Sequence, residues 1–176
     1  GGLIPVLEDT NDIGFQAVAV KDGFGVEPGV WFRLMLGGIT GHKDFARETG
    51  VVVRPDDATK VADAVVRVYI DYGDRTDRNK ARLKYVIDRM GMAKVVAMVE
   101  EKLGRTLDRV PAEALLPRPA FDRAAHIGVH AQKQRGLNWI GVVLPVGRMT
   151  AAQMRGLAEV ARDLGDGDIR LTVWQN

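Results

Sequence analysis

The sequence predicts an α+β protein with mixed or antiparallel sheets and with helices on one face. Three observations lead to this fold class. Residues 13–20 and 31–36 are strand-like runs, residues 55–104 hold three segments with helical periodicity, and residues 137–174 read as strand, helix and strand in succession. A group of strands followed by a group of helices is typical of segregated α+β folds.

The two N-terminal strands are predicted to form a hairpin-like pair. Turn-forming residues separate them, and Gly37-Gly38 ends the second one. The following run Gly37–Lys43, GGITGHK, has a glycine-rich composition that invites comparison with a phosphate-binding loop. It lacks both the GxxxxGK[ST] and the GxGxxG spacing, so a tight turn is expected there instead.

Three amphipathic helices are predicted next, each ended by a glycine. The first follows the N-terminal signal at residues 55–57 and ends at Gly73, the second begins near Thr76-Asp77 and ends at Gly91, and the third ends at Gly104. Their apolar stripes are Val61, Val65, Val68, Tyr69 and Tyr72; Leu83, Val86, Ile87 and Met90; and Val95, Val96, Val99 and Leu103. Residues 105–123 then lose periodicity and gain three prolines, which indicates a linker.

The C-terminal segment is predicted to form a strand–helix–strand unit with a right-handed crossover. Residues 137–146 form its first strand, Thr150 and Gln153 have the spacing of a capping box, and Gly165 ends the helix. The alternation in residues 169–174 places one set of side chains under the helix, namely Ile169, Leu171 and Val173. The side chains on the opposite face are those of Arg170, Thr172 and Trp174. This set suits either contact with a large, flat anionic partner or exposure to solvent.

Composition narrows the possible chemistry. The chain of 176 residues contains neither Cys nor Ser, which removes thiolate metal sites, disulfides and serine or cysteine nucleophiles. No apolar run approaches the length of a membrane span and no signal peptide is visible, so a soluble cytoplasmic protein is expected. A net charge of +2 gives no argument for nucleic acid. His126 and His130 lie too far apart on an extended segment to share a metal ion.

One C-terminal stretch carries a resemblance to a known family. The matching pieces are Gln132-Lys133-Gln134, Gly136-Leu137, Gly141, Pro145-Val146-Gly147-Arg148, Met154, Leu157-Ala158, Gly165, Ile169-Arg170-Leu171-Thr172 and Gln175-Asn176. This run resembles the second ferredoxin-like half-domain of sirohaem-dependent nitrite and sulfite reductases. The QKQ and PVGR pieces are closer to the ferredoxin-dependent nitrite reductase branch. The segment GDRTDRNKARLKYVIDRMG is a second match to the family.

The resemblance implies a domain organisation and a set of cofactors. Residues 1–104 would be the remainder of the first sirohaem domain, 105–123 a linker, and 124–176 the second ferredoxin-like half-domain. The family carries sirohaem and a [4Fe–4S] cluster held by four cysteines, and this chain has none. We therefore expect an internal fragment that binds neither cofactor and is inactive alone. Its expected partners are the remaining domains, ferredoxin or another electron donor, and nitrite or sulfite, with neither nucleic acid nor a membrane.

The resemblance also implies which residues touch the cofactor. Arg135, before Gly136, is the first candidate, because the family often has a cation there. The further candidates are Gln132, Lys133, Arg170, Thr172, Gln175 and Asn176. No catalytic residue and no metal ligand is expected, since Trp174 stands where the first half-domain places its substrate-binding arginine.

A row of cations in the second predicted helix is open to two interpretations. It consists of Arg75, Arg78, Lys80, Arg82, Lys84 and Arg89. A solvated face is favoured, and contact with cofactor carboxylates or an acidic electron donor is the alternative. Three functions also stay open: a nitrite reductase fragment, an assimilatory sulfite reductase fragment, and a stand-alone ferredoxin-like binding module without catalysis.

Overall fold

The computed structural model describes residues 7–42, 44–117, 122 and 124–172. The chain divides into two compact units, Leu7–Pro119 and Ala120–Asn176. Each unit combines helices with antiparallel strands, which confirms the predicted α+β class. No helix among the described residues is long and apolar enough to span a membrane.

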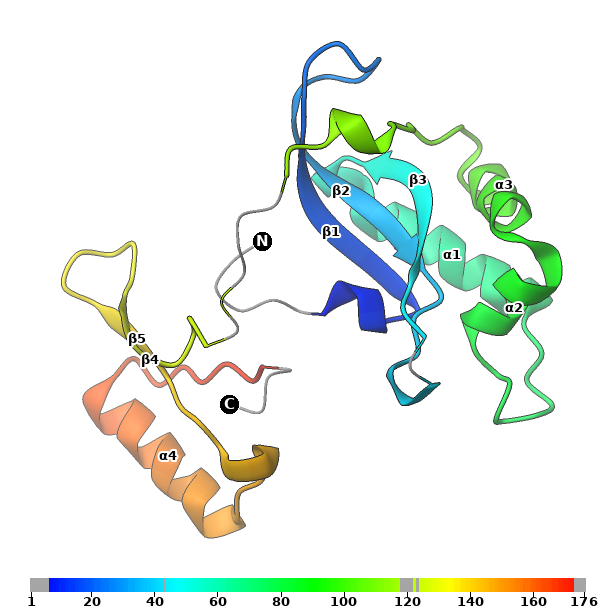
Figure 1. The fold of residues 1–176 in the computed structure, drawn as a ribbon. Helices are drawn as coiled ribbons and strands as arrows, with labels where there is room; N and C mark the ends of the chain where they lie inside the picture. Colours follow the sequence, from blue (N-terminus) through cyan, green and yellow to red (C-terminus); the bar gives the residue numbers. More distant parts are fainter. Residues whose placement is uncertain (1–6, 43, 118–121, 123, 173–176) are drawn as a thin grey trace. The chain divides into compact units, whose positions relative to one another are not determined.

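The first unit is built on a three-stranded antiparallel sheet. Its strands β1 (Ile13–Val20), β2 (Gly29–Leu36) and β3 (Arg47–Val53) lie side by side in chain order. The register pairs Ile13 with Leu36 and Val20 with Gly29, as a hairpin requires. The first two strands confirm the predicted pair (Figure 1), whereas β3 was not predicted. Its polar first half, Arg-Glu-Thr-Gly, hides the strand pattern that only the valine run of residues 51–53 displays.

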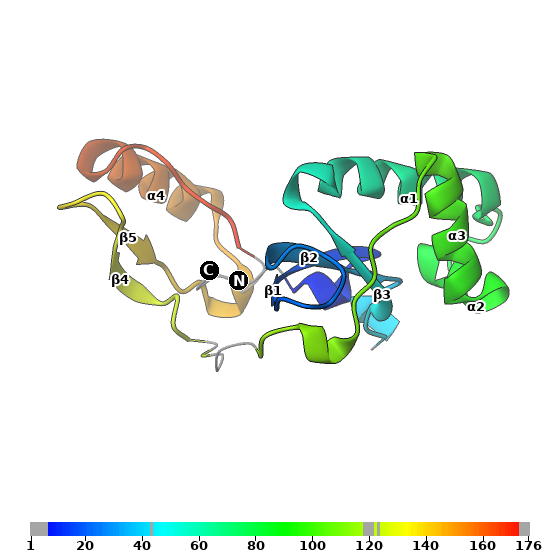
Figure 2. The same ribbon diagram turned by 90° about the horizontal axis from the view of Figure 1, so that it is seen from above.

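Helices cover one face of this sheet. They are α1 (Ala58–Tyr72), α2 (Leu83–Met90) and α3 (Met92–Leu103), and Figure 2 shows α1 lying across the sheet. The main core forms between them, and its fully buried side chains include Leu34, Val51, Val61, Val65, Val95 and Val99. Full burial of each such side chain contributes roughly 1.5–3 kcal/mol to the free energy of unfolding, before the cost in entropy.

The opposite face is covered by the chain that returns after α3. Val52 N donates to Asp108 O at 2.9 Å on one edge, and Leu116 N donates to Ala19 O at 2.9 Å on the other. A second core cluster lies beneath this segment and contains Val18, Val20, Trp31, Val52, Val110 and Ala114. Residues 108–116 fall in the predicted linker yet pack against the first unit, and the family's domain boundary stays a prediction.

The helices of the first unit end at the predicted glycines. Gly73 and Gly91 donate their backbone N–H groups to the last turns of α1 and α2, and Gly104 ends α3 with a φ of 68°. The start of α2 was predicted about six residues too early. The side chains of Asp74 and Asp77 accept hydrogen bonds from the backbone N–H groups two residues on, which gives the chain turns instead of a helix.

The second unit holds a two-stranded hairpin and one helix. Strand β4 (Gly128–Ala131) pairs with β5 (Asn138–Gly141), and α4 (Ala151–Leu164) follows a short turn. Thr150 caps α4 and forms the predicted capping box with Gln153. The predicted strand over residues 137–146 is shorter than expected: β5 ends at Gly141, opposite Gly128 where its partner β4 begins, and Pro145–Gly147 forms a 3-10 turn.

The predicted last strand is absent from the part of it that the structure describes. Residues 169–172 belong to neither of the two sheets that the described residues form, so the described part of the chain does not complete the strand–helix–strand unit. Leu171 was expected beneath the helix and is 85% exposed. Alternation in the sequence does not by itself specify a strand, because a strand also needs a neighbouring strand to receive its hydrogen bonds. Val173 and Trp174 lie outside the described residues.

Candidate functional site

The tip of the β4–β5 hairpin gathers three of the predicted cofactor contacts, namely Gln132, Lys133 and Arg135. The turn closes through hydrogen bonds from Gln132 N to Leu137 O at 2.9 Å and from Leu137 N to Gln134 O at 3.2 Å. Gly136 adopts a φ of 82°, in the left-handed region that favours glycine. The position of Arg135 is therefore set by the glycine that follows it.

The three tip residues have different roles in the local structure. The side chain of Gln132 donates to the carbonyl of Asn138 at 3.0 Å, so it holds the base of the turn. Lys133 and Arg135 are exposed and make no hydrogen bond or ion pair within the described residues. Two free cations that are two residues apart on one turn can neutralise carboxylates of a ligand.

The remaining predicted contacts are not brought to the tip by any described interaction. Arg170 is exposed on the extended chain after α4, and Thr172 on the same segment is half-buried. Gln175 and Asn176 lie outside the described residues. The structure therefore supports a local cluster at the tip, while the joint surface with Arg170 and Thr172 stays a prediction.

An aromatic pair beside this tip was not anticipated. His130 and Trp139 are register partners on β4 and β5, and their rings stack with centroids 4.1 Å apart at 17°. His130 Nε2 also lies 2.9 Å from the carbonyl oxygen of Ile127. The alternation in GVHA and NWIG on either side of a glycine turn is the sequence signal that pairs these two residues. The stack adds a side-chain contact between the two strands that the cation-bearing turn connects.

Half of the predicted cation row in the first unit, namely its last three members, has structural partners. Arg82 contacts both carboxylate oxygens of Asp12, with Nη2–Oδ2 at 2.6 Å. Lys84 lies between Asp44 at 2.8 Å and Asp88 at 2.6 Å, and these hydrogen bonds raise the pKa of Lys84. Arg89 donates to the carbonyl of Tyr72.

The first three cations of the row, unlike the last three, have no side-chain hydrogen-bond or ion-pair partner among the described residues. Arg75, Arg78 and Lys80 stay exposed, on a loop and not on the predicted helix. The solvated interpretation therefore holds for these three residues, while the later cations join the start and end of α2 to Asp12, Asp44 and the last residue of α1.

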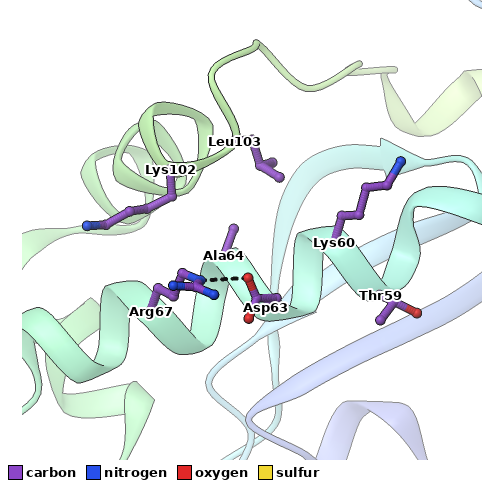
Figure 3. Close-up of a pocket in the computed structure, with 7 residues that line it drawn as sticks. All are labelled: Thr59, Lys60, Asp63, Ala64, Arg67, Lys102 and Leu103. Atoms are coloured by element: carbon purple, nitrogen blue, oxygen red, sulfur yellow. Dashed lines mark hydrogen bonds and ion pairs between the residues drawn. The ribbon is translucent and has the colours of Figure 1, made fainter.

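A shallow cavity of about 470 Å³ lies between α1 and the end of α3. Its lining includes three cations, and each has a nearby carboxylate. Figure 3 shows Arg67 turned to Asp63, 2.7 Å away. The other two pairs are Lys60 with Asp57 at 3.0 Å and Lys102 with Asp71 at 2.6 Å. Because these charges are compensated, the cavity is a weaker candidate for an anion site than the hairpin tip.

The donor set decides which cofactors the chain could hold. Cys is absent from the whole sequence, so the chain supplies no thiolate for an iron–sulfur cluster. Within the described residues, no three His, Asp or Glu side chains converge as metal ligands. The exposed cations of the tip instead suit a ligand that bears carboxylates.

Comparison with known families matches both units separately. A model described as the nitrite and sulphite reductase 4Fe-4S domain matches residues 5–107. A second, described as the nitrite/sulfite reductase ferredoxin-like half domain, matches residues 130–176. The first match covers the sheet–helix unit and the second covers most of the hairpin–helix unit.

Individual relatives agree with these matches. The chain is 38% identical over 170 residues to a chloroplastic ferredoxin–nitrite reductase of Zea mays, covering 94% of this chain and 28% of that protein. It is 33% identical over 176 residues to a ferredoxin sulfite reductase of Mycolicibacterium paratuberculosis, covering 99% and 30%. The solved structure of the Mycobacterium tuberculosis NirA protein superposes with a TM-score of 0.74 at 32% identity, covering 91% of this chain and 28% of that one.

These findings define the class of the protein as a two-unit α+β segment of a redox enzyme family. The chain belongs to the nitrite and sulphite reductase family. It spans about 28% of the length of the relatives that it matches. The resemblance drawn from the QKQ, PVGR and arginine-rich motifs is thereby confirmed at the level of the family.

Proposed function

We propose that the chain is the part of a ferredoxin-dependent nitrite reductase that links a sheet–helix domain to the second ferredoxin-like half-domain. The whole enzyme would reduce nitrite to ammonia with six electrons. The observation that carries this proposal is the order of the two family matches in one chain. It is joined by 38% identity to a ferredoxin–nitrite reductase over 94% of this chain.

In this proposal the chain provides scaffold and cofactor contacts. Sirohaem, when bound, would supply the redox chemistry at its iron. Lys133 and Arg135 would neutralise carboxylates of the macrocycle, with Arg170 as a third cation, while Gln132 holds the turn that presents them. The [4Fe–4S] cluster would be held by cysteines of other domains. Its partners would be those domains, ferredoxin and the oxyanion substrate.

The cofactor role of Arg135 can be tested in the full-length enzyme that carries this segment. Arg135→Ala should lower the sirohaem content, because it removes a free cation without altering the Gly136 turn. The measurement is the Soret absorbance per mole of purified protein. Arg155→Ala is the matched control, since Arg155 is an exposed arginine on α4. Equal haem content in Arg135→Ala and the control would contradict the role of Arg135.

A sulfite reductase is the second candidate. It is favoured by the 33% identity to the mycobacterial ferredoxin sulfite reductase, which extends over the full 176 residues. Measuring kcat/KM for nitrite and for sulfite with reduced ferredoxin, on the same enzyme preparation, separates the two. A higher value for sulfite would replace the nitrite proposal.

A stand-alone binding module is the third possibility. Its natural reading frame would encode no cluster cysteines on either side of this segment. Cysteines with cluster spacing downstream of Asn176 in that reading frame would exclude the module and support the enzyme.

A further inference from the structure

Two Asp-Gly pairs in the sequence have the composition of a self-modifying peptide bond. They are Asp22-Gly23, between β1 and β2, and Asp166-Gly167, after α4. In such a pair the glycine nitrogen attacks the aspartate side chain and closes a succinimide ring. Glycine favours the attack because it has no Cβ atom to obstruct a close approach. Sequence alone does not separate the two pairs, since the dipeptide is the same in both.

At the first pair, the carboxyl group lies against the nitrogen that would attack it. Gly23 N donates a hydrogen bond to Asp22 Oδ1 at 2.8 Å. Both residues are exposed on the loop that joins β1 to β2 (Figure 1). A Cβ atom built on Gly23 would meet no atom beyond its chain neighbours within 4 Å, so a closing ring has open space around it. Groups that are already in contact lose little entropy on the way to the bond.

At the second pair, both reacting groups are held by other partners. Gly167 N donates to Ala161 O in the last turn of α4 at 3.0 Å. Asp166 Oδ1 accepts instead from Asp168 N, also at 3.0 Å. Ring closure here has to break the hydrogen bond to the helix and turn the carboxyl group away from Asp168. The same dipeptide is therefore placed for reaction in one loop and restrained in the other.

We propose that Asp22-Gly23 is a site of spontaneous isoaspartate formation, and that hydrogen bonds protect Asp166-Gly167 from the same reaction. Gly23 N bonds to Cγ of the protonated Asp22 side chain and gives up its proton, and the displaced hydroxyl leaves with a proton as water. A second water molecule opens the ring at either carbonyl carbon. One opening restores aspartate, and the other leaves the backbone running through the side chain of Asp22. The balance requires only water.

The isoaspartate would lie in a loop that packs against the second core cluster. Lys21 N donates to Ala114 O at 2.9 Å on one side of the pair, and Phe24 and Val26 contact the cluster on the other side. An additional methylene group in the backbone between these contacts changes the length of the loop. The modification therefore acts on the first unit, and the proposal depends on neither the substrate nor the cofactor of the enzyme.

Incubation of the purified chain at physiological temperature in mildly acidic buffer tests the proposal. Proteolytic peptides that contain each pair are then assayed for isoaspartate with an isoaspartyl methyltransferase and by mass spectrometry. In the folded chain, isoaspartate should accumulate at least about tenfold faster at Asp22 than at Asp166, because alignment of reacting groups changes rates by orders of magnitude. In the chain unfolded by guanidinium, the two rates should approach each other.

Asp22→Glu is the matched variant. It keeps the charge but lengthens the side chain, so the ring closes far more slowly and the isoaspartate signal of this peptide should disappear. The signal at Asp166 should stay as in the unaltered chain. Equal rates at the two pairs in the folded chain would overturn the proposal. A difference that persists unchanged in guanidinium would overturn it as well, because the flanking residues and not the fold would then set the rates.

Discussion

At the scale of single residues, Gly38 shows why a family sequence can require glycine. A Cβ atom at this position would lie 2.6 Å from Asp9 O and 2.7 Å from Asn11 O. Gly38 N also donates to Asn11 O at 3.0 Å, so the end of β2 lies directly against the N-terminal turn. The glycine pair that resembles a phosphate loop in the sequence is thus a site of close backbone packing.

The close approach at Gly38 leads to a stability prediction. Gly38→Ala should lower the free energy of unfolding by about 1–3 kcal/mol, because the methyl group forces two backbone segments apart. Gly41→Ala is the control, since a methyl group at Gly41 would have no other atom within 4 Å and the φ of Gly41 is ordinary. Urea unfolding of both variants measures the difference. Equal midpoints for Gly38→Ala and Gly41→Ala would contradict the role of close packing at Gly38.

Glu100 is a second residue whose role is structural. Its Oε1 accepts hydrogen bonds from Arg109 Nη1 and from Leu107 N, both at 2.8 Å. The hydrogen bond from Arg109, and to a lesser degree that from Leu107, lowers the pKa of Glu100 below its ordinary value of 4.5. The carboxylate thereby ties the last turns of α3 to the returning chain that covers the sheet.

The lowered pKa of Glu100 predicts a pH dependence. The ionised carboxylate stabilises the fold fully above the pKa of the unfolded chain, and this contribution is lost as the pH falls through the lower pKa of the folded state. Glu100→Gln should cost about 1–2 kcal/mol at neutral pH. The difference from the unaltered chain should shrink in acid. Glu101→Gln, an exposed neighbour, is the control in unfolding titrations at both pH values.

At the scale of elements, local signals at helix ends act as the sequence indicates. Thr150 Oγ1 accepts from Gln153 N at 3.2 Å, and Gln153 Oε1 accepts from Thr150 N at 2.8 Å. Because α4 buries no side chain, its stability depends on this cap more than that of α1, which packs into the main core. Capping therefore contributes a larger share of helix stability in α4 than in α1.

The cap of α4 can be removed without touching a core. Thr150→Ala should destabilise α4 by about 1 kcal/mol, because it leaves the N–H of Gln153 without its acceptor. Hydrogen exchange of the α4 amides measures the change, and α1 amides serve as an internal reference. Thr150→Ser keeps the hydroxyl and should restore protection. Unchanged exchange in Thr150→Ala would show that α4 does not depend on the cap.

At the scale of the whole molecule, the two units differ in completeness. The sheet of the first unit is covered on both faces, by α1 to α3 and by the return segment with Val110 and Ala114. The second unit has a hairpin, a capped helix and an extended segment after the helix, with one buried residue among those described. It presents exposed cations at its tip, and α4 buries none of its side chains among the described residues.

This difference predicts the behaviour of the isolated chain. The purified 176-residue protein should show no Soret band and should reduce neither nitrite nor sulfite, because it has no cysteine for a cluster and, in the proposed function, other domains complete the cofactor site. Absorption spectra and an assay with a reduced electron donor measure both properties. A Soret band that stays with the protein through purification would contradict the expectation.

Sequence patterns predicted the elements whose signals are local. The stripes of α1 and α3, their terminal glycines and the Thr150 cap all lie within a few residues of the feature that they specify. Strand β3 was missed because its polar first half pairs with a strand more than ten residues away. The strand expected at residues 169–174 failed in its described part for the converse reason, since alternation cannot supply the neighbouring strand that a ladder needs.

The sequence by itself determined the α+β class, the helix ends, the lack of thiolate ligands and membership of the reductase family. Each of these depends only on the composition of the chain or on the spacing of residues near one another in the sequence. Only the tertiary structure decided which cations form ion pairs with carboxylates. Arg82 pairs with Asp12, seventy residues away, and Lys84 with Asp44, whereas Lys133 and Arg135 stay free among the described residues. Side chains distant along the chain meet only once the sheet and helices pack, so the partition between anchoring and available charges is a property of the fold.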